Sequence, residues 1–304
     1  MRLTGKRVAR RRIGAHLSIG DGYAGALDRI VTIGGNCLQI FSASPRGWKF
    51  ATVSEKEAGE FRAKKEELGV DPVYFHASYL INLASDEAVG DLSERSLVAE
   101  LSVAEKIGAR GSVVHLGSFK GAAGGERERQ YGLLIRRIKE ILKQTPKETL
   151  FIAENAGTRK IGQTLEELAQ VVRDVGDKRL RVCLDTCHLH AAGYDLRTAA
   201  ALEKFLDFFD RIIGFPRLEL FHVNDSRDPF GSLRDRHDNI GEGMVGRSVF
   251  SLLLNHDKTK NLPFIIETPG FNGMGPDKEN IDRLREMVTG QELFALIKAP
   301  RSAG

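Results

Sequence analysis

The sequence has few of the features that mark secreted, membrane-spanning or multidomain proteins. Its three cysteines, Cys37, Cys183 and Cys187, are odd in number and lie in apolar runs, which predicts a reducing compartment and no disulfide framework. No apolar run approaches the roughly 20 residues of a membrane helix, and the basic N-terminus lacks the apolar segment of a signal peptide. No Pro-, Gly- or Ser-rich linker divides the 304 residues. We therefore expect a single-domain cytoplasmic protein.

The net charge of +4 is concentrated at the N-terminus. Residues 1–12 carry Lys and Arg but no acidic residue. This composition predicts a basic arm over 1–12, which is solvated or touches phosphate groups, followed by one catalytic domain over 13–304.

The rest of the chain alternates between two patterns. Short β-rich runs occur at 13–18, 37–42, 72–76, 112–116, 150–154, 181–185, 218–223 and 264–268. Helical patterns separate them, at 22–34, 54–68, 90–108, 125–144, 164–175, 196–213 and 246–257, with a last one near 277–298. Strict alternation of eight strands and eight helices predicts an α/β fold, a (β/α)₈ TIM barrel, with an open doubly wound sheet as the alternative. Segment 224–246 has no clear period, which predicts a functional loop.

Six of the apolar runs end in a residue that can bind metal. These residues are His76, His115, Glu154, Asp185, His222 and Glu267. The carboxyl ends of barrel strands meet at one face, where catalytic groups collect. Buried carboxylates that gather there need cations, so the pattern predicts a metal centre.

Three further residues extend this set. His188 follows Asp185 where the strand must bend into its loop, and Asp235 and His237 share one side of an extended loop after His222. Zinc takes about four ligands, so nine ligands fit two or three ions. Nitrogen and oxygen donors suit zinc, with Mn²⁺ as an alternative at one site, and they suffice without Cys187. The resulting site has a small positive charge and attracts an anionic substrate, such as a phosphodiester.

These motifs resemble the endonuclease IV family of zinc-dependent apurinic/apyrimidinic endonucleases. The resemblance runs from Ile13-Gly-Ala-His16 to Glu267. It includes His76-Ala-Ser-Tyr-Leu-Ile-Asn-Leu83, Glu154-Asn155, Cys183-Leu-Asp-Thr-Cys-His188, His222-Val-Asn-Asp225, Asp235-Arg-His237 and Gly241-Glu-Gly243. Each of the family's nine metal ligands finds its residue type here, in order.

The resemblance implies three zinc ions. His76, His115 and Glu154 would hold the first. Glu154, Asp185, His222 and Glu267 would hold the second, and His188, Asp235 and His237 the third. It also implies a base-excision-repair hydrolase that cleaves duplex DNA 5′ of an abasic site, leaving a 3′-hydroxyl and a 5′-deoxyribose phosphate, with 3′-phosphodiesterase activity as a further expectation. The attack would be in-line, with Glu267 orienting or deprotonating water and Glu154 bridging two ions.

Members of this family insert side chains into the DNA base stack. The positions that match are Arg46, Tyr79 and Leu80. An aromatic and an aliphatic group can fill the gap left by an abasic nucleotide, while an arginine reaches the backbone or groove. The alternative is that Tyr79 and Leu80 belong to the core. We also expect a monomer, as the family resemblance implies.

Two other functions are compatible with parts of the pattern. Glu154, Asp185, His222 and Glu267 alone would suit a metal-dependent sugar isomerase or epimerase related to xylose isomerase, but five ligands would then be unexplained. A non-catalytic DNA-binding protein would be expected to have lost a ligand, and none is missing.

Overall fold

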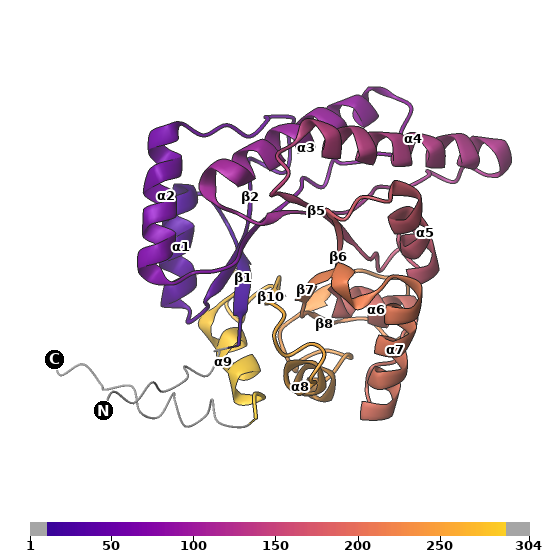
Figure 1. Ribbon diagram of the computed structural model, residues 1–304. Helices are drawn as coiled ribbons and strands as arrows, with labels where there is room; N and C mark the ends of the chain where they lie inside the picture. Colours follow the sequence, from indigo (N-terminus) through magenta and orange to yellow (C-terminus); the bar gives the residue numbers. More distant parts are fainter. Residues whose placement is uncertain (1–10, 290–304) are drawn as a thin grey trace, which may run out of the picture.

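The computed structural model describes residues 11–289, which fold into the expected closed barrel of parallel strands (Figure 1). The barrel strands are β1 (Ile13–Leu17), β2 (Cys37–Phe41), β3 (Val73–His76), β4 (Gly111–Val114), β5 (Leu150–Glu154), β6 (Leu180–Asp185), β7 (Leu218–His222) and β10 (Phe264–Ile266). Each strand pairs with the next, and β10 pairs with β1 to close the ring. The open sheet is therefore excluded.

Helices cover the outside of the ring. They are α1 (Gly22–Thr32), α2 (Glu55–Leu68), α3 (Ala88–Ile107), α4 (Gly124–Gln144), α5 (Leu165–Val175), α7 (Ala199–Ile212), α8 (Arg247–Asn255) and α9 (Lys278–Glu286). Local sequence signals set several of their ends. Ser54 and Glu57 exchange hydrogen bonds in a capping box at the start of α2, and Gly69 ends that helix in the left-handed conformation at φ +64°.

The structure adds elements that the sequence pattern did not predict. The bend expected between Asp185 and His188 is a short helix, α6 (Thr186–Ala192), and Phe215–Arg217 form a 3₁₀ turn before β7. Segment 224–246 is a loop as expected, but it contains a small antiparallel pair, β8 (Asp225–Ser226) and β9 (His237–Asp238). These elements are too short to give a hydrophobic period. The basic arm falls almost wholly outside the described residues. The last helix, α9, ends at Glu286 and is therefore shorter than the expected 277–298, of which residues 290–298 lie outside the described range.

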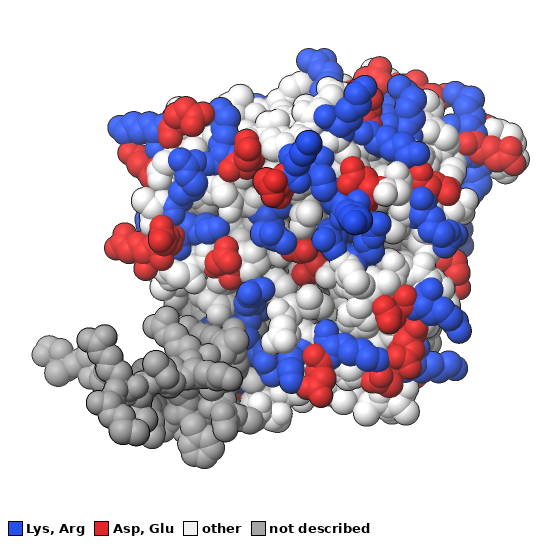
Figure 2. All heavy atoms as spheres, in the orientation of Figure 1, with Lys and Arg blue, Asp and Glu red and all other residues white. Residues whose placement is uncertain are grey.

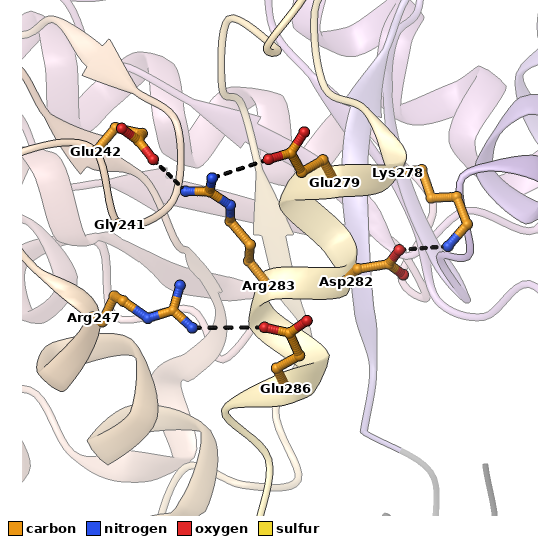
Figure 3. Close-up of a pocket in the computed structure, with 8 residues that line it drawn as sticks. All are labelled: Gly241, Glu242, Arg247, Lys278, Glu279, Asp282, Arg283 and Glu286. Atoms are coloured by element: carbon orange, nitrogen blue, oxygen red, sulfur yellow. Dashed lines mark hydrogen bonds and ion pairs between the residues drawn. The ribbon is translucent and has the colours of Figure 1, made fainter. Parts of the chain in front are cut away.

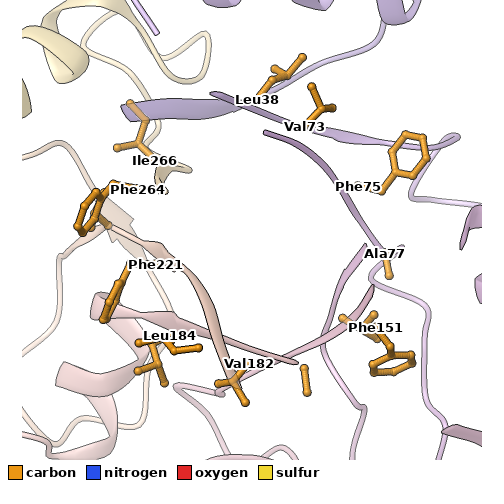
Figure 4. Close-up of a cluster of buried hydrophobic side chains, with 14 of the residues drawn as sticks. Leu38, Val73, Phe75, Ala77, Phe151, Val182, Leu184, Phe221, Phe264 and Ile266 are labelled. Carbon is orange, nitrogen blue, oxygen red and sulfur yellow. The ribbon is translucent and has the colours of Figure 1, made fainter. Parts of the chain in front are cut away.

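The core has two parts, on the two sides of the barrel wall. Side chains such as Leu38, Phe75 and Phe151 point outward and pack against the helices (Figure 4). A second cluster fills the barrel interior and consists of Cys37, Tyr74, Val113, Leu150, Ile152, Cys183, Leu220 and Ile265. Because side chains alternate along a strand, the residue two positions after an interior residue also points inward, toward the end where the strands finish.

Gly14 takes the corresponding interior position on β1. A Cβ atom there would lie 1.9 Å from the carbonyl oxygen of Cys37, so no larger residue fits between β1 and β2.

Basic and acidic side chains are interspersed over the molecular face that Figure 2 shows. Within residues 11–289, no helix has the length and apolar character needed to cross a lipid bilayer.

Candidate metal centre

A cleft of about 650 Å³ opens where the barrel strands end. Its lining includes His16, His76, His115, His188, Asp235, His237 and Glu267, together with Arg46, Tyr79 and Met274 at the rim. The cleft therefore gathers residues from β1, β3, α6, the 224–246 loop and the segments that follow β4 and β10.

A second pocket, between α8, α9 and the turn at Gly241, has a different character (Figure 3). Its charged side chains pair with one another: Arg283 lies 2.9 Å from Glu279, and Arg247 lies 3.7 Å from Glu286. Because these charges are mutually compensated, this pocket lacks the unpartnered donors of a ligand site.

The first group of candidate ligands comes from three consecutive strands. The Nε2 atoms of His76 and His115 lie 3.3 and 3.4 Å from Oε2 of Glu154. Each of the three residues stands two positions after an interior residue, which aims its side chain into the cleft. Their ligand atoms are close enough to one another to hold one ion.

The second group lies beside the first and shares Glu154 with it. Nδ1 of His222 lies 3.1 Å from Oε1 of Glu154, 3.9 Å from Oδ2 of Asp185 and 3.6 Å from Oε2 of Glu267. The two oxygens of Glu154 thus face different groups. This geometry suits a carboxylate that bridges two ions.

The third group includes two residues of the 224–246 loop, Asp235 and His237. Oδ1 of Asp235 lies 3.1 Å from Nε2 of His188 and 3.3 Å from Nε2 of His237. Asp185, which the sequence placed only in the second group, also contributes here, with its Oδ2 3.8 Å from Nε2 of His237. The structure therefore brings all nine predicted residues together, with Asp185 between two groups.

The hydrogen bonds of the histidines indicate which nitrogen is free. Nδ1 of His76 donates to the carbonyl of Ala77 at 2.8 Å, and Nδ1 of His188 donates to the carbonyl of Asn155 at 2.9 Å. The opposite nitrogens face the carboxylates. Within the described chain, Nε2 of His188 and Nε2 of His237 are buried beside carboxylates without a hydrogen-bond partner. Oriented imidazoles with an unpartnered nitrogen, beside carboxylates, fit divalent metal ions.

Buried charge at this centre is balanced between imidazoles and carboxylates. Burial raises the pKa of Glu154, but His115 and His222 outweigh burial and hold that pKa well below its usual range. Burial, together with the nearby His76 and His188, lowers the pKa of His115 to about 4 despite the opposing effect of Glu154, so this imidazole is neutral and able to bind metal near pH 7. Burial raises the pKa of the Cys187 thiol to about 12, which disfavours the thiolate that metal binding requires.

The loop that carries Asp235 and His237 is anchored by a buried carboxylate. Asp225 accepts hydrogen bonds from the backbone N–H groups of Ser226, Gly241 and Val245 at 2.8–2.9 Å. These bonds join the start of the loop to its end. They hold its middle, where Asp235 lies, over the cleft.

Sequence reasoning missed four residues that contact the ligands. Asn224 donates to Oδ2 of Asp185 at 2.6 Å, and the Asn155 side chain accepts from the backbone N–H of Asp185 at 2.7 Å. His16 and Gln39 contact Glu267. The strand period could have found these last two, because they follow the interior positions Gly14 and Cys37 by two residues.

The residues expected to contact DNA lie at the rim. Tyr79 is 69% exposed and Leu80 is 37% exposed, so neither belongs to the core. The Tyr79 ring packs edge-on against Phe41, with 5.3 Å between ring centroids. Arg46 is exposed on the loop after β2 and lines the same cleft.

Comparisons with known proteins agree with this geometry. Residues 27–289 match the family described as xylose isomerase-like TIM barrel. A probable endonuclease 4 of Halothermothrix orenii is 39% identical over 281 residues, which covers 90% of this chain and 99% of that protein. The crystal structure of endonuclease IV from Thermus thermophilus superposes with a TM-score of 0.77 at 34% identity, covering 91% of this chain and 98% of that one.

The fold is shared more widely. A D-psicose 3-epimerase from Clostridium cellulolyticum superposes with a TM-score of 0.63 at 16% identity, covering 91% of each chain, which shows likeness of fold alone. The family match and the relatives above 30% identity span most of the sequence. The chain therefore belongs to the xylose isomerase-like TIM barrel family and, within it, to the endonuclease IV family.

Proposed function

We propose that the protein is a DNA-repair hydrolase that cleaves the phosphodiester bond 5′ of an abasic site in duplex DNA, with three zinc ions as cofactors. The observation that carries the proposal is the convergence of nine His, Asp and Glu side chains, six of which line one cleft, into three adjoining groups. Membership of the endonuclease IV family and the name of the T. thermophilus relative support the same activity.

Each group would hold one ion. His76, His115 and Glu154 would bind the first, and Glu154, Asp185, His222 and Glu267 the second. The third would be bound by His188, Asp235 and His237, with Asp185. When bound, divalent ions stabilise charge on the phosphoryl group and make water nucleophilic near neutral pH. Mn²⁺ is the alternative at one position, because the donors are all nitrogen and oxygen.

The carboxylates have distinct tasks in this proposal. Glu154 is fully buried between two groups and fixes the distance between them. Glu267 lines the cleft and is partly exposed, so its Oε2, which faces the second group, can also orient the attacking water and accept a proton from it. Burial raises the pKa of Glu267, but His222 and His16 hold it below the usual range, so the side chain is ionised and ready to accept a hydrogen bond.

The rim residues would recognise the DNA. Tyr79 and Leu80 present exposed apolar surface next to the cleft and would fill the space beside the missing base. Arg46 would contact the phosphate backbone or a groove. The five ligands outside the Glu154, Asp185, His222 and Glu267 set favour this activity over sugar isomerisation or epimerisation, for which those four would suffice.

One assay tests the proposal. Purified protein is incubated with a duplex that carries a single tetrahydrofuran abasic analogue, with zinc or after stripping with a strong chelator. We expect one nick 5′ of the analogue that leaves a 3′-hydroxyl and disappears on metal removal. No nick would refute the proposed activity, whereas nicking that survives complete metal removal would refute the mechanism.

We further propose a 3′-phosphodiesterase activity, a monomeric state and a cytoplasmic location. A primer with a blocked 3′ end tests the first, since release of the block should allow extension by a polymerase. Sedimentation analysis of the purified protein tests the monomeric state. The three cysteines are free and buried, which is compatible with a reducing compartment.

A further inference from the structure

Every strand of the barrel ends in a polar side chain at the cleft, including the two strands that supply no candidate metal ligand. Six strands end in, or directly before, six of the nine candidate ligands, and the other three come from α6 and the 224–246 loop. The remaining two, β1 and β2, contribute His16 and Gln39 at the same position, two residues after the interior positions Gly14 and Cys37. Gln39 is fully buried, which demands a partner for each end of its amide group.

The amide of Gln39 contacts two ligands of the second group at once. Its Oε1 accepts a hydrogen bond from Nε2 of His222 at 2.9 Å, and its Nε2 donates to Oε1 of Glu267 at 2.6 Å. The reverse orientation of the amide would set two oxygen acceptors against each other at Glu267. The neighbours of Gln39 therefore fix its orientation, and its Oε1 fixes the proton of His222 on Nε2.

The consequence for His222 is that Nδ1 carries the lone pair. Nδ1 is the atom that faces Glu154, Asp185 and Glu267. Without an acceptor at Nε2, the proton could occupy Nδ1 and point at the place where an ion would bind. A hydrogen bond at the opposite nitrogen also makes an imidazole a stronger ligand.

His16 supports the other ligand. Its Nδ1 lies 2.9 Å from Oε1 of Glu267, the same oxygen that receives the Gln39 amide. Nδ1 of His16 and Nε2 of Gln39 lie 3.1 Å apart, side by side on this oxygen. Both donors therefore hold one oxygen of Glu267, and the second oxygen, Oε2, is left to face His222.

We propose that Gln39 and His16 are positioning residues for the metal centre, holding Oε2 of Glu267 and Nδ1 of His222 toward the ion of the second group. This proposal deepens the proposed function and rests on it for the presence of an ion. It does not depend on the DNA substrate, and its test needs no DNA. Failure of the test is therefore distinguishable from failure of the proposed cleavage reaction.

The test measures zinc affinity of metal-stripped protein by competition with a chromophoric chelator. Gln39→Glu keeps the size of the side chain but replaces the donor to Glu267 by a carboxylate. We expect one of the bound ions to be held about 10- to 100-fold more weakly, and the others to be unaffected. Co²⁺ substitution gives a second readout, because its visible absorption reports the ligand geometry at the weakened position.

A pair of variants at His16 separates positioning from folding. His16→Ala removes the donor to Glu267, whereas His16→Asn keeps an N–H group near the place of Nδ1. We expect weaker binding of one ion in the first and its substantial recovery in the second. His256→Ala is the matched control, because Nε2 of His256 makes a similar contact with Glu203, at 2.6 Å and away from the cleft, and this variant should bind zinc like the parent.

Three outcomes would overturn the proposal: zinc affinity of Gln39→Glu equal to that of the parent, equal weakening of all ions, or His16→Asn as weak as His16→Ala. The melting temperature of each metal-stripped variant is recorded alongside. If a variant at one of the two positions does not fold without metal, the variants at the other position provide the test, since Gln39 and His16 each contact Glu267.

Discussion

Arg236 forms a two-point salt bridge with Asp228, although both of its neighbours in the sequence face the metal centre. Nε of Arg236 donates to Oδ2 of Asp228 at 2.7 Å, and Nη2 contacts Oδ1. Alternation along the extended loop sends Asp235 and His237 to one side and Arg236 to the other. The salt bridge therefore anchors the segment between two candidate ligands from its opposite side.

Replacing Asp228 by Asn should loosen this anchor. The amide keeps the size of the side chain but loses the charge that pairs with Arg236. We expect the ion of the third group to be bound about tenfold more weakly, with little change at the other two positions. Asp195→Asn is the matched control, because Asp195 makes a similar two-point contact with Arg197, at 2.8 and 2.9 Å, away from the ligands. Equal zinc affinities for the two variants would contradict this role.

Glu267→Gln should separate chemistry from binding. The amide keeps the shape of the side chain, but it cannot accept a proton from water. We expect turnover on the abasic duplex to fall by about 10²- to 10⁴-fold while the dissociation constant for DNA changes little. Glu242→Gln serves as the control, since Glu242 is exposed and pairs with Arg283 outside the cleft. If DNA binding and zinc content collapse together with turnover, Glu267 acts mainly as a ligand.

Tyr79→Ala should reduce discrimination between abasic and intact duplexes. Stacking on an aromatic ring is worth about 1–3 kcal/mol, so we expect the affinity ratio to fall by about tenfold or more. Tyr79→Phe should retain most of the ratio, because its ring can still pack against Phe41. Leu80→Ala should have a smaller effect, since Leu80 exposes less of its surface. Unchanged discrimination in Tyr79→Ala would remove this residue from the recognition surface.

The candidate ligands were easiest to predict from the sequence where a single strand carries both the apolar strand pattern and the ligand at its end. On six strands an interior residue, such as Tyr74 or Ile152, is followed two positions later by a candidate ligand, so strand boundaries and ligand positions could be predicted together. The side chains of His16 and Gln39 follow the same period, but neither was expected at the site. A histidine within a glycine-containing strand and a glutamine within an apolar run carry no charge signal by themselves.

Contacts that depend on loop geometry could not be predicted. The shared position of Asp185 between two groups follows from α6, which starts directly after it and turns His188 back toward the cleft. Helix α6 is only seven residues long and gives no period. Likewise, the anchor of the 224–246 loop on Asp225 joins residues up to 20 positions apart, which no local pattern records.

Metal removal should destabilise the folded protein. Glu154 and Asp185 are fully buried carboxylates near each other, and bound cations would offset their repulsion. An ion present at 100 times its dissociation constant stabilises the native state by about 2.7 kcal/mol. We expect the melting temperature of the stripped protein to rise with added zinc in a concentration-dependent manner. The rise should be much smaller in Glu154→Gln, because Glu154 serves two groups; a melting temperature independent of zinc would contradict the proposed centre.

Glu100 should make stability depend on pH. This residue of α3 is buried and accepts hydrogen bonds from the hydroxyl groups of Ser112 and Ser42, yet burial dominates and raises its pKa from 4.5 to about 7. Between these two values the folded protein binds more protons than the unfolded chain, so the contribution of Glu100 to stability falls as the pH rises. The full cost above pH 7 is about 3 kcal/mol.

Glu100→Gln removes this dependence because its amide does not titrate. The free energy of unfolding of the parent, relative to that of Glu100→Gln, should therefore decrease by about 3 kcal/mol between pH 4.5 and pH 8. Denaturant unfolding of the zinc-loaded proteins at several pH values measures the free energy of unfolding of the parent and of the variant. The effects of other titrating groups cancel in the difference between the two. Glu105→Gln, an exposed position on the same helix, is the matched control. Parallel pH profiles for the parent and Glu100→Gln would show that Glu100 ionises at the same pH in the folded and unfolded states.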